Sequence, residues 1–233
     1  MIFGRKRSIS SVMKGLVAAV AVLGWSFTAS ASEQQQLVDK AKVTVEALQA
    51  QSDMEQFRKL LAVSKGVVVF PQVLKAGFIV GGAGGTGVLM ARGVDGSWSS
   101  PAFYTMGQAS VGLQIGAEAK ELILVIMTDK GLQAIIDNQV KLGGDLSAAV
   151  GPVGKNVGAS ATTNMDVDVF SFAKNAGLFI GASVEGSILD ARDDWQSAYY
   201  GKSITATDIV LKRTIDAPGA AALKQALTAA EAK

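Results

Sequence analysis

The sequence of 233 residues contains no cysteine and no histidine, and only four prolines. Without cysteine there is no disulfide, no thiol chemistry and no lipid-modified N-terminal cysteine. The joint absence of both residues excludes Ser-His-Asp and Cys-His nucleophile systems and zinc sites of the usual nitrogen and sulfur type. No nucleophile–base pair can be named among the residues that are present. We therefore predict a protein without enzymatic activity and without a cofactor.

Charged residues are also few, at 18% of the chain, whereas hydrophobic residues make up 49%. This balance argues against disorder, and the length suits one domain of ordinary size. The formal net charge is +2. That small excess comes from four cations near the N-terminus, so it indicates nothing about the surface of the folded domain.

The N-terminal segment has the pattern of a secretory signal peptide. Cations at 5–7 and at Lys14 precede an uncharged stretch, 15–32, in which Ala29 and Ala31 have the spacing read by a signal peptidase. The apolar run is shorter than the roughly 20 residues of a membrane span. We predict that residues 1–31 are removed and that the mature protein is periplasmic or secreted, peripheral on a membrane; retention as an anchor is the alternative. Cleavage leaves a net charge of −2, so bulk charge does not predict binding to nucleic acid.

Hydrophobic periodicity divides the rest of the chain into three parts. Residues 32–65 have helical spacing, and Ser52 followed by Glu55 predicts a new helix near Asp53. Residues 66–212 contain short β-like runs separated by glycines, and 213–233 form an alanine-rich helical tail. We predict a single α+β domain in which a glycine-rich, curved antiparallel β-sheet, barrel- or sandwich-like, is flanked by N- and C-terminal helices.

Turn and glycine patterns refine this expectation. Asp95-Gly96 lies between two β-like runs and predicts a hairpin turn, and Thr128 predicts the cap of a short helix that ends near Gln139. Paired glycines four residues apart recur in the segments 77–81, 112–116 and 177–181. In a strand these pairs allow sharp curvature or the close approach of another layer.

A glycine-rich stretch, 82–87, fits the pattern G-x-G-x-x-G of dinucleotide-binding proteins. That fold also needs a helix after the glycines and an acidic residue about twenty positions further on. Arg92-Gly93 and Asp95-Gly96 interrupt any helix, and no acid occurs between Asp95 and Glu118. We interpret the stretch as a β-turn or bulge and predict no nucleotide ligand.

Acidic residues cluster near the end of the β-like region, at Glu185, Asp190, Asp193 and Asp194. They lack the alternating spacing of a calcium loop, and the interleaved Arg192 favours a salt-bridged helix start. A metal at this cluster stays an open alternative. Asp166 and Asp168 share one face of a predicted strand, which we expect to be exposed to solvent.

The helical segment at 32–65 carries a dense group of cations: Lys40, Lys42, Arg58, Lys59 and Lys65. Apolar residues at Leu37, Phe57 and Leu60 alternate with them. A helix with a basic and an apolar face can lie on an anionic bilayer. The same pattern also fits a helix that packs its apolar stripe on the β-sheet, and the residues alone leave both interpretations open.

Seven short motifs together resemble the SYLF-domain family, in the family's order and over about residues 35–212. They are the segments 64–71 (SKGVVVFP), 77–87, 95–101 (DGSWSSP), 112–116 (GLQIG), 177–182, 184–186 (VEG) and 199–201 (YYG).

In eukaryotes, members of this family bind membrane phosphoinositides, and some bind actin filaments. The resemblance implies a non-enzymatic module whose basic N-terminal segment contacts lipid headgroups, with Lys65 and the preceding cations as the contacts and Trp98 as a core residue. The predicted export signal departs from those relatives. Affinity for anionic phospholipid therefore carries over, whereas actin is not expected as a partner. The alternative is a structural or protein-interaction module of the cell envelope, and the resemblance does not identify the lipid.

Overall fold

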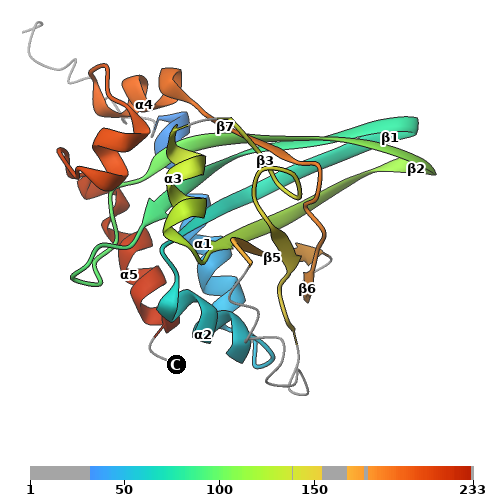
Figure 1. Cartoon of the computed structure of the whole chain (residues 1–233), viewed down its shortest axis with the longest axis horizontal. Coiled ribbons are helices and arrows are strands. Elements are labelled where there is room, and N and C mark those ends of the chain that lie inside the picture. Colours follow the sequence, from blue (N-terminus) through green and yellow to red (C-terminus); the bar gives the residue numbers. More distant parts are fainter. Residues whose placement is uncertain (1–31, 138, 154–166, 176–177, 232–233) are drawn as a thin grey trace, which may run out of the picture. The chain divides into compact units, whose positions relative to one another are not determined.

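The computed structural model describes residues 32–137, 139–153, 167–175 and 178–231. The helices are α1 (Glu33–Gln49), α2 (Glu55–Val63), α3 (Asp129–Asp137), α4 (Asp193–Tyr200) and α5 (Ala221–Glu231), with a π-helical turn η2 (Thr207–Leu211) and a 3₁₀ turn η3 (Pro218–Ala220). The strands are β1 (Gly66–Ala91), β2 (Ala102–Ile126), β3 (Val140–Lys141), β4 (Ala148–Val150), β5 (Val169–Asn175), β6 (Leu178–Gly181) and β7 (Ile188–Ala191). The predicted α+β class, with helices from both ends of the chain beside a curved sheet, is confirmed (Figure 1).

The short β-like runs expected between residues 66 and 127 are joined into two long strands. β1 and β2 pair antiparallel from Gly66 opposite Ile126 to Leu89 opposite Ala102. The loop 92–101 connects them, and Gly96 has a φ of 80°, the left-handed conformation that a tight turn requires. The hairpin predicted at Asp95-Gly96 is confirmed.

The ribbon formed by β1 and β2 bends back on itself. The N–H of Arg92 donates to the carbonyl of Lys65 at 2.8 Å, so the two ends of β1 meet. The bend therefore lies midway along β1, where the register shifts between Gly77 and Ile79. Gly77 lies opposite Gly116 at this bend. Two of the three glycine pairs are therefore at the point where the ribbon curves, as predicted (Figure 1). The third pair begins at Gly177, outside the described residues.

The glycines of the stretch 82–87 allow the two halves of β1 to pack closely. The prediction that this stretch forms a β-turn or bulge is wrong, because each of its residues pairs in regular register with β2 and the strand continues to Ala91. A Cβ on Gly87 would lie 2.5 Å from the carbonyl oxygen of Val69 and 2.6 Å from Cδ1 of Phe70. The glycines in this part of β1 therefore serve packing, and no helix follows them as a dinucleotide-binding fold requires.

The other strands extend the sheet from β2, in the order β3-β7-β2-β5-β4, while β6 pairs with β5. Among the described strands, every pair is antiparallel except β4 with β5, which is parallel. The sheet is thus mixed at one edge, contrary to the antiparallel expectation. A parallel pair needs a long connection, and the chain has the length for one between the end of β4 at Val150 and the start of β5 at Val169.

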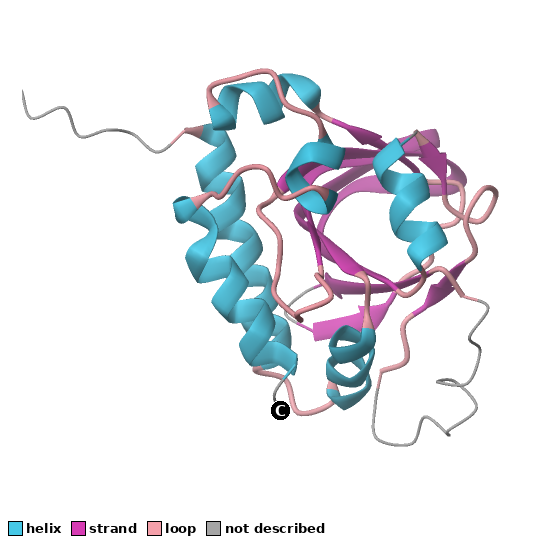
Figure 2. Cartoon of the chain, turned by 60° about the vertical axis from the view of Figure 1, so that its left-hand side comes forward, coloured by secondary structure: helices cyan, strands magenta, loops and turns pink. Residues whose placement is uncertain are grey.

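Both faces of the central strands are buried. Alternate residues of β1 divide between two clusters: Val68 and Phe70 belong to one, and Val67 and Val69 to the other. Figure 2 shows the strands arranged around a ring, with long helices along one side. The second cluster joins the strands to α1, α2 and α5, which explains why the strand sequences are uninterrupted apolar runs.

The helical segment at 32–65 is confirmed as α1 and α2. The hydroxyl of Ser32 accepts the N–H of Gln35 at 3.2 Å and caps α1. The capping box predicted at Ser52 does not form: α2 has Met54 at its N-cap without a side-chain bond, and the Ser52 hydroxyl donates to Asp53 instead. At its other end α1 contacts α5, where the Gln49 amide donates to the carbonyl of Ala229 at 2.9 Å.

Asp168 is buried, contrary to the prediction that it faces solvent. Only 6% of the residue is exposed, and its carboxylate accepts hydrogen bonds from the Thr128 hydroxyl (2.6 Å) and from the N–H and hydroxyl of Ser147 (3.0 and 2.9 Å). Burial acts to raise the pKa of Asp168, but these hydrogen bonds outweigh it and hold the pKa below its ordinary value. Thr128 also caps α3, as predicted, by accepting the N–H of Gly131. Asp166 lies outside the described residues.

Replacing Asp168 by alanine is expected to destabilise the fold by about 2 kcal/mol at pH 7, because Thr128 and Ser147 lose a buried acceptor. Since the folded-state pKa is lowered, this stabilisation is present above the unfolded-state pKa of about 3.9 and is lost as the pH falls through the folded value. Thermal melting of the wild type and of Asp168→Ala at pH 7 and pH 3 should show that the gap between their melting temperatures is smaller in acid. The control is Asp53→Ala, which removes an exposed carboxylate. If the gap between the wild type and Asp168→Ala is the same at both pH values, Asp168 does not have this role.

Candidate functional site

Four of the five predicted contact cations already interact with other groups of the chain. Ion pairs join Lys42 to Glu46 (3.0 Å), Lys59 to Glu55 (2.6 Å) and Lys65 to Asp129 (3.0 Å), and Arg58 donates to the carbonyl of Gln51 (3.3 Å). Such exposed pairs contribute little, about 0–1 kcal/mol each, so a stronger anion can compete for the cation. Lys40 differs, because no acidic side chain of the described residues lies within ion-pairing distance of it.

Lys40 lines a hollow between α1 and the β1–β2 ribbon, which we call the basic groove. Its volume is about 580 Å³, and it is lined by Lys40, Val43, Thr44, Pro71, Gln72, Ala119, Lys120, Glu121 and Lys174. Lys174 pairs with Glu121 at 2.9 Å, whereas Lys120, like Lys40, has no acidic partner in the described part of the chain. Three lysines against one glutamate leave the groove with an excess of two positive charges.

Local features of the sequence account for the groove. Proline lacks an N–H for the ladder, and the register of β1 shifts between Phe70 and Val73, so Pro71 and Gln72 bulge toward α1. α1 turns a stripe that includes Val38, Ala41 and Val45 into the core, which leaves Lys40 exposed beside the bulge.

Sequence reasoning did not group Lys120 and Lys174 with Lys40, because no local pattern joins them. The ladder between β2 and β5 places Glu121 opposite Lys174, and Lys120 is its neighbour on β2. These residues are brought to α1 only by the sheet, so a sequence pattern alone gives no signal for the set.

Exposed apolar side chains adjoin the basic groove. Val43 on its wall is 59% exposed, and Leu74, on the far side of Pro71 and Gln72, is 56% exposed. Leu74 and Lys40 together line a second, smaller hollow of about 250 Å³. Ammonium groups can hold phosphate or carboxylate anions here, and the apolar side chains can contact hydrocarbon.

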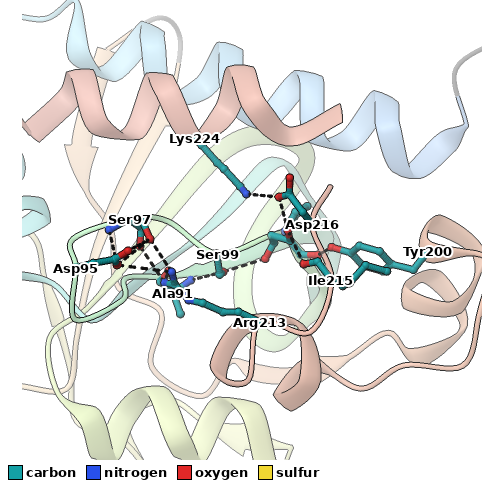
Figure 3. A network of polar contacts seen from close by, with 11 residues as sticks. Ala91, Asp95, Ser97, Ser99, Tyr200, Arg213, Ile215, Asp216 and Lys224 are labelled. Atoms are coloured by element: carbon teal, nitrogen blue, oxygen red, sulfur yellow. Dashed lines mark hydrogen bonds and ion pairs between the residues drawn. The ribbon is translucent and has the colours of Figure 1, made fainter. Parts of the chain in front are cut away.

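A third hollow, of about 750 Å³, which we call the serine groove, is lined by Ser97, Trp98, Ser99, Ser100, Arg213, Thr214, Ile215, Asp216, Lys224, Gln225, Thr228 and Ala229. Its charged side chains bind one another (Figure 3): Arg213 donates to the hydroxyl and the carbonyl of Ser97 (2.6 and 2.9 Å), and Lys224 pairs with Asp216 at 2.8 Å. The hydrogen bond from Lys224 holds the pKa of Asp216 below its ordinary value. Arg213 keeps a φ of 51°, so this network holds a strained residue in place.

Trp98 is buried beside the turn, as predicted, and joins the hairpin loop to α5. The residue is 4% exposed, and its indole N–H donates to Glu231 at 2.7 Å. The guanidinium of Arg92 stacks on the indole ring, 4.6 Å from its centre, and pairs with Glu231 at 2.5 Å. These three residues form a nearly buried cluster that attaches the last turn of α5 to the hairpin loop between β1 and β2.

The acidic cluster is a salt-bridged helix start, as predicted. Arg192 immediately precedes α4, and its guanidinium donates two hydrogen bonds (2.8 and 2.6 Å) to Asp194 in the first turn of that helix. These hydrogen bonds lower the pKa of Asp194 to about 2. Asp190 accepts a hydrogen bond from Gln139 at 3.2 Å. Among the described residues, no three acidic side chains are grouped so that they could hold a metal ion.

None of the helices in the described residues has the length and apolar character needed to cross a bilayer.

The relationship to known proteins rests on the part of the chain that begins near the start of β2 and ends in the last turn of α5. Residues 107–230 match the family described as "Ysc84: Las17-binding protein actin regulator". The chain belongs to this family. The Ysc84 match confirms the resemblance to SYLF-domain proteins, and Ysc84 proteins form a family of binding and regulatory domains rather than of enzymes.

Relatives of the Ysc84 family are about one-third identical to the chain. The human SH3 domain-containing YSC84-like protein 1 is 35% identical over 156 residues, which are 66% of this chain and 45% of that protein. The SH3 domain-containing protein PJ696.02 of Schizosaccharomyces pombe is 39% identical over 150 residues (63% and 35%), and Protein YSC84 of Saccharomyces cerevisiae is 34% identical over 161 residues (68% and 34%). The chain thus spans less than half the length of these Ysc84 relatives.

Proposed function

We propose that this chain is a non-enzymatic module that binds the headgroups of anionic phospholipids at a cell-envelope membrane. The observation that carries the proposal is the basic groove, where Lys40, Lys120 and Lys174 surround one hollow beside the exposed apolar side chains of Val43 and Leu74. A lipid phosphate offers oxygens to the lysines, and the adjoining acyl chains offer an apolar surface to the two aliphatic side chains.

The charge of the groove must act locally. Without residues 1–31 the chain is net anionic, so only a concentrated group of cations can attract a negative surface. Each lysine close to an anionic bilayer contributes about 1 kcal/mol, and salt screens this attraction over about 10 Å at 0.1 M. Binding should therefore rise with the anionic lipid fraction and fall with salt. Lys42, Arg58, Lys59 and Lys65 remain predicted contacts with a smaller share, because lipid must first displace their present partners.

Replacing Lys40 and Lys120 together by glutamine is expected to lower the affinity for anionic vesicles about 30-fold, since two cations contribute about 2 kcal/mol. The melting temperature should stay nearly unchanged, because neither lysine has an ion pair among the described residues to lose. Co-sedimentation with vesicles of graded anionic fraction measures the effect. The matched control is Lys141→Gln with Lys202→Gln, which removes the same charge elsewhere on the surface from two exposed lysines that also have no ion pair among the described residues.

A variant of the helical segment, Arg58→Gln with Lys59→Gln and Lys65→Gln, separates the two groups of cations. If this triple change abolishes vesicle binding while the Lys40 and Lys120 pair does not, the contact lies on the helical segment and the groove is not the site. Equal recovery on neutral and anionic vesicles would contradict a charge-led contact of either kind.

We also propose export, with residues 1–31 as a cleaved signal peptide; these residues lie outside the described part of the chain. In support, Ser32 caps α1 through its side chain, so cleavage after Ala31 preserves the cap at the new N-terminus. Protein recovered from the periplasm or the medium should begin at Ser32 when its N-terminus is sequenced. An intact Met1 in a membrane fraction would favour a retained anchor.

The second candidate function is protein binding in the envelope. The observation in its favour is the serine groove, which is lined by part of the motif at 95–101 and lies next to α5. The family description concerns actin regulation and Las17 binding by the relatives themselves. A Thr228→Arg change would place a long side chain in the serine groove. If the chain binds lipid through the basic groove, this change should leave its binding to vesicles unaffected. Actin is not proposed as a partner.

A further inference from the structure

The bend of the β1–β2 ribbon, residues 76–83 with 108–117, carries no charged residue. Its sequence is glycine-rich and includes six large apolar residues: Phe78, Ile79, Val80, Val111, Leu113 and Ile115. Figure 1 shows the bend at the end of the ribbon, away from the five helices. Its polar side chains are the uncharged ones of Gln108, Ser110 and Gln114. A bend that supports only the fold would tolerate charged residues, so an uncharged bend at this place points to an apolar environment.

Strand pairing flanks the bend on both sides of the register shift. Gly77 lies opposite Gly116 and Ile79 opposite Gly112, with Val80 opposite Val111 beyond them. Backbone groups that enter a bilayer without hydrogen-bond partners cost several kcal/mol each, and this pairing supplies partners up to the shift itself, where Phe78 and residues 113–115 lack an opposing residue. A paired ribbon is therefore suited to the interfacial region of a membrane.

Cations surround the base of the bend. Lys75 immediately precedes it on β1, and Lys120 of the basic groove follows it on β2 after Glu118 and Ala119. Leu74, at the same level, is 56% exposed. An apolar tip followed by lysines matches the order of layers in an anionic bilayer, with hydrocarbon inside and phosphates at the surface.

We infer that the ribbon bend inserts into the interfacial region of an anionic bilayer when the basic groove binds lipid headgroups. This inference rests on the proposed function and deepens it, because it assigns a second, apolar contact to the same membrane surface. The occupant of the bend is the bilayer; association of two bends from two copies of the chain is the competing outcome.

The chain contains no cysteine, so a single one can be introduced and labelled without background. Phe78→Cys carries an environment-sensitive fluorophore in the bend, and Ser203→Cys, in the exposed loop after α4, is the matched control. On vesicles containing anionic phospholipid, the probe at 78 should shift to the blue and be protected from aqueous iodide, while the probe at 203 should remain quenchable. If Phe78→Cys does not fold, Val111→Cys places the probe on the paired strand.

Leu74→Asp provides a readout without a label. A charge at this exposed position should lower vesicle affinity about tenfold, the equivalent of losing one partly buried leucine contact, while the melting temperature stays near that of the wild type. Vesicle binding with the probe at 78 fully quenchable overturns insertion and leaves the proposed function standing. No binding to anionic vesicles overturns both. A blue shift without vesicles that grows with protein concentration assigns the bend to a second copy of the chain and overturns membrane insertion.

Discussion

Gly87→Ala is expected to lower the melting temperature by about 10 °C. The added Cβ would lie 2.5 Å from the carbonyl oxygen of Val69 and 2.6 Å from the ring of Phe70, which is fully buried and cannot move aside. Overpacking of this kind costs about 3 kcal/mol, and each kcal/mol shifts the melting temperature of a domain this size by about 2–4 °C. Thermal unfolding followed by circular dichroism measures the change.

The matched control is Gly107→Ala on the partner strand of the same ribbon. A Cβ there meets no atom within 4 Å, and the residue does not require a positive φ. Its replacement should change stability by less than about 0.5 kcal/mol or raise it slightly, because alanine restricts the unfolded chain. If both variants melt like the wild type, the two halves of β1 do not pack as closely as described.

Glu231→Ala is expected to destabilise the fold by about 3 kcal/mol. The side chains of Arg92 and Glu231 are only 15% and 16% exposed, so removal of the carboxylate leaves a nearly buried guanidinium without its counter-charge. The indole N–H of Trp98 loses its acceptor at the same time. The guanidinium keeps only uncharged partners, the carbonyls of Leu61 (2.9 Å) and Gly96 (3.4 Å). Chemical denaturation at neutral pH gives the free energy directly.

Glu55→Ala is the control, because it breaks an ion pair of similar length whose partners, Glu55 and Lys59, are both more than half exposed. Its cost should stay below about 1 kcal/mol. Replacing Arg92 by methionine together with Glu231 by leucine should recover much of the loss, since apolar residues of similar volume can substitute for a buried pair. If Glu231→Ala and Glu55→Ala lower the free energy of unfolding by the same amount, Glu231 is solvated.

Local signals in the sequence predicted the elements that depend on local chemistry. The turn at Asp95-Gly96 follows from a positive φ, and the start of α3 follows from the hydroxyl of Thr128. The long strands were predicted as fragments, because glycines such as Gly87 resemble breaks in a pattern while the neighbouring half of β1 requires them. Asp168 was misplaced since Ser147, which binds its carboxylate, lies on a different segment of the chain.

The candidate site could be predicted only in part for the same reason. Lys40 belongs to a helical pattern that is visible in the sequence. Lys120 and Lys174 reach it through the pairing of β2 with β5, and that register is a property of the folded sheet. Ion pairs such as Lys65 with Asp129 likewise join residues that the sequence separates, so the availability of a cation could not be read from spacing.

Because α1 packs against α5 as well as against β1, the apolar face of α1 is not fully covered until α5 has been synthesised. The contact between α1 and α5 joins residues far apart in the sequence, and contacts of that kind form slowly during folding. Completion of the fold therefore depends on α5, and loss of α5 would uncover part of the surface of Val38, Val45 and Leu48.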